Sequence, residues 1–178
     1  RTIELAVQAE DLGFESLWVF DHFHTVPEPT DEITFESFSQ LAALAMATKR
    51  VRLGHMVICT AFRNPALTAK LASTIDVISG GRAVLGIGAG WNQEECDAFG
   101  IQLGSMRERF DRFEEGLEVL EAGALRIAAE VHPELQDHRP VIGEQLLERD
   151  DPVEVAVEIA VLLATVDAVE DGPRVPGA

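Results

Sequence analysis

The chain has 178 residues, a formal net charge of −17 and only two cysteines. The acidic excess argues against binding to nucleic acid or to an anionic membrane surface, because both depend on clusters of Lys and Arg. No apolar run reaches the roughly 18 residues that span a bilayer, and the cysteines suit neither a disulfide framework nor a metal site. We therefore expect a protein of the reduced cytoplasm.

Helical and strand-like segments alternate along the first two thirds of the chain. Apolar residues recur at helical spacing in four segments, which we predict as helices: 3–12, 35–48, 65–79 and 106–121. Short apolar runs predict three strands, near 16–20, 51–58 and 83–88. Because strands that alternate with helices pair in parallel through right-handed crossovers, we expect a parallel sheet with these strands in sequence order.

Residues 121–178 differ in composition from the rest, since they contain no lysine and no aromatic residue. Val153–Ile159 alternates like a strand, whereas Asp151 and Pro152 before it are typical of a helix start. We predict a helix there and no fourth parallel strand from this region.

The first candidate site follows the first strand, where Asp21 and His22 stand side by side. A histidine at a strand end can accept or donate a proton near neutral pH, and an adjacent carboxylate can orient it. The loops after parallel strands are where α/β folds carry their chemistry. The alternative is that both side chains simply face solvent.

The second strand contains Gly54 and His55 and ends at Cys59. A glycine inside a strand indicates close approach of another group, which is either a flat ligand ring or a tightly packed neighbour. His55 is more typical of a core histidine than of a ligand. Cys59 either lines a site or packs, since no base is placed to activate it.

The third strand ends in a glycine-rich run with Gly86, Gly88 and Gly90, followed by Trp91 and Asn92. The spacing differs from the dinucleotide-binding fingerprint, so we reject a Rossmann domain. Backbone N–H groups there could hold phosphate or ring carbonyls, or the glycines could serve a turn of positive φ. Trp91 would stack on a ligand or cap the sheet.

Two charged segments have ordinary alternatives. Arg63 precedes the helix start at Asn64 and Pro65, where it could contact an anion or lie at the surface. The charged run 107–118 is typical of a solvated helix face with ion pairs four residues apart.

Several of these segments together resemble the luciferase-like flavin and deazaflavin oxidoreductases, in particular the branch that uses coenzyme F420. The segments that carry the resemblance are Leu17–Phe23, Arg63–Ala66, Thr74–Arg82, Leu85–Asn92 and Glu108–Phe110. The family fold is a (β/α)₈ TIM barrel, which typically needs about 250 residues. The resemblance thus implies a partial barrel over residues 1–120, with its first and later strands missing, and a divergent acidic tail over 121–178 that is helical or disordered.

The resemblance also implies a cofactor ring across the carboxyl ends of the strands. The residues that would contact the cofactor are Asp21, His22, Met56, Val57, Cys59, Gly88, Ala89, Gly90 and Asn92. A non-prolyl cis peptide bond is expected at Met56–Val57, and His22 is the expected catalytic acid or base. We expect six of them to line one shared concavity, namely Asp21, His22, Met56, Cys59, Gly88 and Asn92.

The expected activity is hydride transfer between coenzyme F420 and a small organic substrate that the sequence does not identify. One alternative is an FMN-dependent monooxygenase of the same superfamily. Another is a non-catalytic truncated barrel that persists by self-association as a homo-oligomer.

Overall fold

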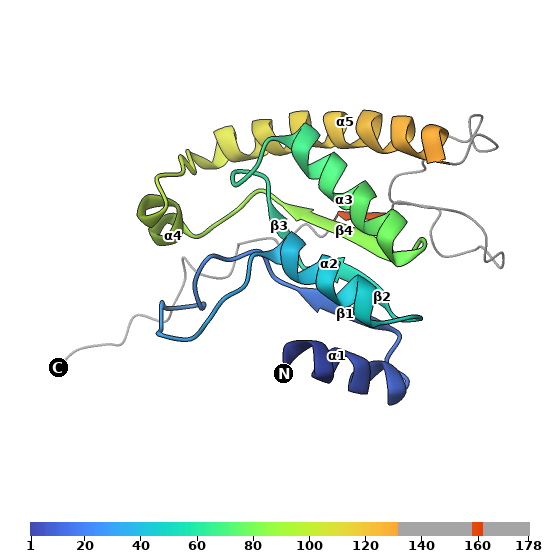
Figure 1. Cartoon of the computed structure of the whole chain (residues 1–178). Helices are drawn as coiled ribbons and strands as arrows, with labels where there is room; N and C mark the ends of the chain where they lie inside the picture. Colours follow the sequence, from blue (N-terminus) through green and yellow to red (C-terminus); the bar gives the residue numbers. More distant parts are fainter. Residues whose placement is uncertain (132–157, 162–178) are drawn as a thin grey trace, which may run out of the picture.

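The computed structural model describes residues 1–131 and 158–161 of the chain, and within them all strands lie in one parallel sheet. The strands are β1 (Ser16–Val19), β2 (Arg52–His55), β3 (Ile58–Cys59), β4 (Ala83–Gly88) and β5 (Glu158–Val161). Their order is β1-β2-β4-β3, with β5 paired to β4 as well. The three strands predicted from the sequence are therefore parallel neighbours in sequence order, as expected (Figure 1).

The second predicted strand consists of two pieces, β2 and β3, which both pair with β4. Leu53 is opposite Ala83 in β2, whereas Ile58 is opposite Ile87 in β3, so the register shifts by one residue between them. The Met56–Val57 peptide bond at this shift is cis, as the family resemblance implied. The strand thus has a bulge that lies at the carboxyl end of the sheet.

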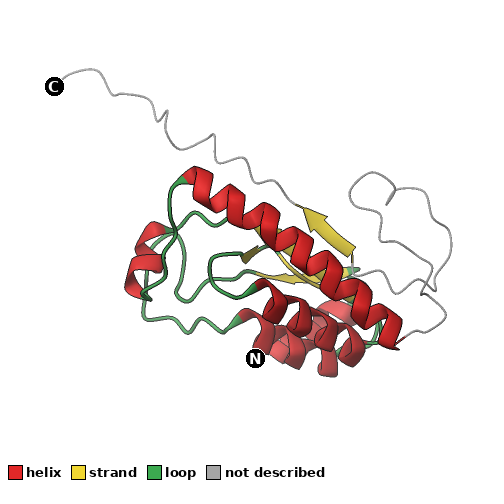
Figure 2. Cartoon of the chain, turned by 90° about the horizontal axis from the view of Figure 1, so that it is seen from above, coloured by secondary structure: helices red, strands yellow, loops and turns green. Residues whose placement is uncertain are grey.

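Helices cover one face of the sheet (Figures 1 and 2). They are α1 (Thr2–Asp11), α2 (Ser37–Ala47), α3 (Pro65–Ser79), α4 (Gln93–Ala98) and α5 (Met106–Val131). The predicted start of α3 is confirmed, because the Asn64 side chain accepts a hydrogen bond from the Ala66 N–H at 2.9 Å. Gly80 ends the helix in the left-handed conformation that favours glycine.

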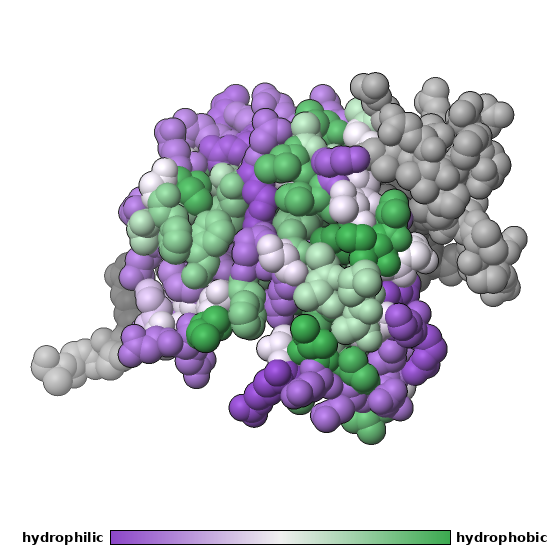
Figure 3. Space-filling view, in the orientation of Figure 1, coloured by the Kyte–Doolittle hydropathy of each residue, from purple (hydrophilic) through white to green (hydrophobic). Residues whose placement is uncertain are grey.

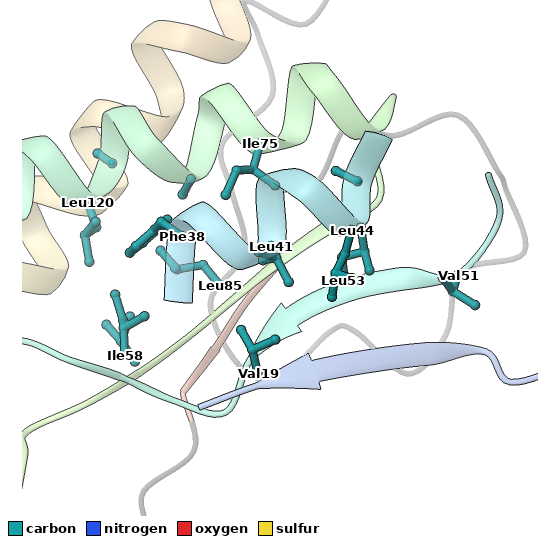
Figure 4. Close-up of a cluster of buried hydrophobic side chains, with 14 of the residues drawn as sticks. Val19, Phe38, Leu41, Leu44, Val51, Leu53, Ile58, Ile75, Leu85 and Leu120 are labelled. Atoms are coloured by element: carbon teal, nitrogen blue, oxygen red, sulfur yellow. The ribbon is translucent and has the colours of Figure 1, made fainter. Parts of the chain in front are cut away.

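The hydrophobic core lies between the sheet and helices α2, α3 and α5 (Figure 4). Leu53 and Ile87 point from neighbouring strands into it and are fully buried, as is Leu41 of α2. Because strand side chains alternate between faces, Gly54 and the Trp18 beside it face the other way. Trp18 is 40% exposed, so this second face is open within the described part of the chain.

Two predictions for the later part of the chain are wrong. Helix α5 continues to Val131, ten residues beyond the predicted end. Glu158–Val161 forms the parallel strand β5, although we predicted a helix over Val153–Ile159 and no fourth parallel strand. The alternating pattern prevailed over the helix-start signal, because the second edge of β4 offers unpaired backbone groups that a strand satisfies. Residues 153–157 lie outside the described residues.

None of the helices described here is both long and apolar enough to cross a lipid bilayer.

Candidate functional site

Asp21 lies at the carboxyl end of β1, where it joins three segments of the chain. It is 3% exposed. Its carboxylate accepts hydrogen bonds from the Ser37 hydroxyl at 2.8 Å, from the Cys59 backbone N–H at 3.0 Å and from both terminal nitrogens of Arg63 at 2.7 and 2.8 Å. Both carboxylate oxygens are thus engaged within the protein, and they tie the end of β1 to α2 and to the loop after β3.

Arg63 is paired with two carboxylates and does not present a free charge to a ligand. Besides Asp21 it donates to Glu36, the N-cap residue of α2, at 2.8 Å. Burial alone would lower the pKa of Arg63, but its hydrogen bonds and charge interactions with Asp21 and Glu36 outweigh burial and raise it. From the sequence we expected Arg63 either to contact an anion or to lie at the surface. In the structure its partners are carboxylates of the protein itself, and its side chain is largely buried.

His22 contacts a carboxylate that the sequence interpretation did not identify. Its Nδ1 lies 2.8 Å from Oε2 of Glu95, whose side chain is completely buried, and the other oxygen of Glu95 accepts the backbone N–H of Phe23. The imidazole is 16% exposed. The group that orients His22 is therefore Glu95 of α4, and the neighbouring Asp21 is used elsewhere.

Aromatic side chains flank His22 on two sides. The Phe20 ring lies 5.7 Å from the imidazole and the Trp91 ring 5.8 Å from it, measured between ring centroids. Phe20 and Trp91 are about half exposed, and so is Met56, whose backbone N–H donates to the carbonyl of Val19 at the end of β1. The carboxyl end of the sheet therefore presents ring-sized apolar surfaces beside an imidazole.

The glycine-rich end of β4 packs tightly against the β2–β3 bulge. A Cβ atom on Gly86 would overlap the carbonyl oxygen of His55, and one on Gly88 would lie 2.8 Å from the Val57 side chain. Gly90 has a φ of +84°, and a Cβ there would lie 2.6 Å from Sγ of Cys59. These glycines are required by close contacts inside the sheet, and at Gly90 by the left-handed backbone as well.

The loop after β4 is fixed by residues from two helices. Arg109 of α5 donates a hydrogen bond to the carbonyl of Gly90 at 2.9 Å, so this residue of the charged run faces inward. Asn92 is the N-cap of α4, and its side chain accepts the N–H of Glu95 at 3.1 Å. Arg107, by contrast, makes the expected surface pair with Asp111 four residues on.

The residues of the second strand serve mainly for packing. The ring of Trp18 occupies the space beside Gly54, so the close neighbour of this glycine is a side chain of the protein itself. His55 is 2% exposed, and neither ring nitrogen has a hydrogen-bond partner within the described part of the chain. Burial raises the pKa of the Cys59 thiol to about 11, which keeps it protonated and unreactive at neutral pH.

The predicted site residues are linked by direct contacts at the carboxyl ends of the strands. Asp21 binds the N–H of Cys59, Cys59 is opposite Gly88 in the sheet, and Asn92 positions the Glu95 that contacts His22. A cavity of about 330 Å³ lies elsewhere, between the loop after β3 and α5, and none of the predicted site residues lines it. The single shared concavity stays a prediction.

Comparison with known proteins agrees with this geometry. The sequence profile of the luciferase-like monooxygenase family matches residues 1–160, well beyond the segment over which we expected the resemblance. An F420-dependent glucose-6-phosphate dehydrogenase of Amycolatopsis mediterranei is 34% identical over 119 residues, which are 66% of this chain and 35% of that protein. The chain thus spans about a third of the length of this relative.

Two solved structures are similar to the described fold. An F420-dependent secondary alcohol dehydrogenase with an F420–acetone adduct has a TM-score of 0.57 and 29% identity, over 66% of this chain and 36% of that one. The oxygenating constituent of 3,6-diketocamphane monooxygenase from Pseudomonas putida, bound to FMN, has a TM-score of 0.57 and 28% identity, over 67% and 32%. With a parallel βα sheet, the cis bulge and a profile match over most of its length, the chain belongs to the luciferase-like monooxygenase family.

Proposed function

We propose that this chain is part of a barrel that transfers a hydride between coenzyme F420 and a small organic substrate. The observation that carries the proposal is His22, which Glu95 holds at the carboxyl end of the sheet between two half-exposed aromatic rings. The F420-dependent relative and the F420-bound structural neighbour support the choice of cofactor.

The residues present fit a flat heteroaromatic cofactor. Phe20, Met56 and Trp91 are 48, 51 and 51% exposed, and they offer apolar surface beside the strand ends. The loop of Gly88, Ala89 and Gly90 would hold the polar edge of the ring through its backbone. When bound, the deazaflavin supplies or accepts the hydride, and this chain's own residues place the ring and exclude water from one side.

His22 would move the proton that accompanies hydride transfer. An alcohol that loses a hydride must also lose its hydroxyl proton, and a carbonyl that gains one must gain a proton. An imidazole at the strand end, with a carboxylate on its other side, can do both near neutral pH. Asp21 would hold the strand ends in place rather than contact the substrate, because its oxygens already bind Ser37, Cys59 and Arg63.

A second candidate is an FMN-dependent monooxygenase, which is favoured by the likeness to the FMN-bound neighbour. FMN and the deazaflavin have similar flat rings, so the described apolar surfaces suit both.

Titration of F420 and of FMN, each followed by fluorescence, distinguishes the candidates. We expect saturable binding of F420 that is tighter than binding of FMN. In the complete barrel, His22→Ala should lower turnover by about 10²–10⁴-fold with little change in F420 affinity, because general acid–base catalysis has this magnitude. His24→Ala is the matched control, since His24 contacts only the nearby Thr25 carbonyl among the hydrogen bonds found. Tight binding of FMN alone would favour the monooxygenase, and binding of neither cofactor would contradict both candidates.

A further inference from the structure

We propose that Glu95 is the positioning residue of the site, and that it fixes His22 in the tautomer with the proton on Nδ1. The inference deepens the proposed function and rests on it for its catalytic meaning. Its structural content concerns two side chains from segments that are 73 residues apart in the sequence.

The contacts of Glu95 define which imidazole nitrogen is available. One oxygen of Glu95 lies 2.8 Å from Nδ1 of His22 and the other accepts the Phe23 N–H. A carboxylate only accepts hydrogen bonds, so Nδ1 must be the donor. In the neutral ring Nε2 then carries the lone pair, and it is the nitrogen that can accept a proton from a substrate.

The surroundings make Glu95 a rigid support. Its side chain is 0% exposed, and its backbone N–H is held by the Asn92 cap. In a usual capping box the glutamate at this position reaches back to the N-cap residue of its own helix. Here it crosses to the loop after β1 and holds both the side chain of His22 and the backbone of Phe23.

Aromatic packing closes the region around this contact. The Phe23 ring lies 4.5 Å from the Phe62 ring and 4.7 Å from the Phe99 ring, between centroids, and Phe99 directly follows α4. The loop that carries His22 is therefore attached to α4 by both the carboxylate and the Phe99 ring. A carboxylate on Nδ1 also stabilises the imidazolium that forms when Nε2 takes a proton.

NMR of the chain labelled with ¹⁵N-histidine tests the assignment directly. Two-bond ¹H–¹⁵N correlations report which ring nitrogen carries the proton, and the His22 signals are identified by their loss in His22→Gln. We expect an Nδ1–H tautomer in the native chain. In Glu95→Gln the amide can accept from Phe23 and donate to Nδ1, so the ring should switch to the Nε2–H tautomer. Glu94→Gln, at an exposed neighbouring position, is the matched control and should change nothing.

Each result decides the assignment. An Nε2–H tautomer in the native chain overturns the inference, even if the variant fails to fold. An unchanged tautomer in folded Glu95→Gln overturns it as well. In the complete barrel, Glu95→Gln should lower turnover more than tenfold while F420 binding is kept, as for other orienting carboxylates. If the tautomer switches but F420 does not bind, the inference stands and the proposed function fails.

Discussion

His22 lies just after β1 and His55 is the last residue of the neighbouring β2, but the two have opposite surroundings. His22 keeps a charged partner and a partly exposed ring, which suit proton transfer. His55 is buried against Phe38, with 4.4 Å between ring centroids, and neither of its nitrogens has a hydrogen-bond partner among the described residues. Burial lowers the pKa of His55 from 6.5 to about 4, because it outweighs the opposite effect of the Asp21 and Glu36 carboxylates.

His55 should make the stability of the chain depend on pH between about 4 and 6.5. In this range the unfolded state binds the proton and the folded state does not, so stability falls as the pH falls. A shift from 6.5 to about 4 corresponds to about 3 kcal/mol in the free energy of unfolding. Urea unfolding of the native chain and of His55→Leu across this range measures the difference.

The variant should lose correspondingly less stability on acidification. Glu10 and Glu36 also have pKa values lowered to about 2, but they are present in both proteins, so their effect cancels in the comparison. Parallel pH profiles for the two proteins would show that His55 is protonated in the folded state.

At the scale of elements, the bulge between β2 and β3 and the glycines of β4 form one unit. The bulge brings the carbonyl of His55 and the side chain of Val57 against β4, where only glycine leaves enough space. This contact sets the register in which β3 pairs with the end of β4, where Cys59 is opposite Gly88. It thereby positions the loop that follows Gly88.

Gly86→Ala should therefore destabilise the chain by about 2 kcal/mol or more, since the added methyl group overlaps a backbone atom that cannot move alone. Gly116→Ala in α5 is the matched control. Its nearest neighbour would be the Pro65 side chain at an ordinary 4.0 Å, and the gain in helix propensity should stabilise by about 0.5–1 kcal/mol. Thermal unfolding of both variants tests the contrast, and equal effects would show that the two glycines are not distinguished by packing.

At the scale of the whole molecule, negative charge strongly predominates. The chain carries a formal charge of −17, and the outer side of α5 forms a hydrophilic edge along the top of the molecule in Figure 3. Hydrophobic residues gather over α2 and α3 in the same view. The exposed apolar side chains of these helices include Met46 of α2 and Leu67 and Val77 of α3. Like charges on α5 repel one another, and salt at 0.1 M largely screens the repulsion between exposed charges that are more than about 10 Å apart.

Salt should accordingly stabilise the folded chain. We expect the melting temperature to rise when sodium chloride is increased from about 0.02 M to about 0.3 M, because self-repulsion of the compact state is screened. The double variant Glu114→Lys, Glu118→Lys reduces the charge on the exposed side of α5 and should show a smaller salt effect. A melting temperature that falls with salt would mean that ion pairs such as Arg63–Asp21 outweigh the repulsion.

The sequence by itself determined most of the local structure of the first 120 residues, although not the short helix α4, and it indicated the end of the sheet where the candidate site lies. Strand and helix periodicity, the Asn64–Pro65 start and the Gly80 stop depend on interactions within a few residues, so they can be predicted from neighbours alone. The family resemblance added the cis bond at Met56–Val57, for which no local signal exists.

Only the tertiary structure decided which side chains meet. Glu95 was not among the predicted site residues, and nothing within its own segment indicates that it reaches His22 from 73 residues away. In the same way Asp21 was paired with Arg63, and β5 was formed where a helix was expected, because a distant charge and an open strand edge outweighed local preference. Periodicity encodes which face of an element is buried, whereas the partner on that face depends on how the elements pack.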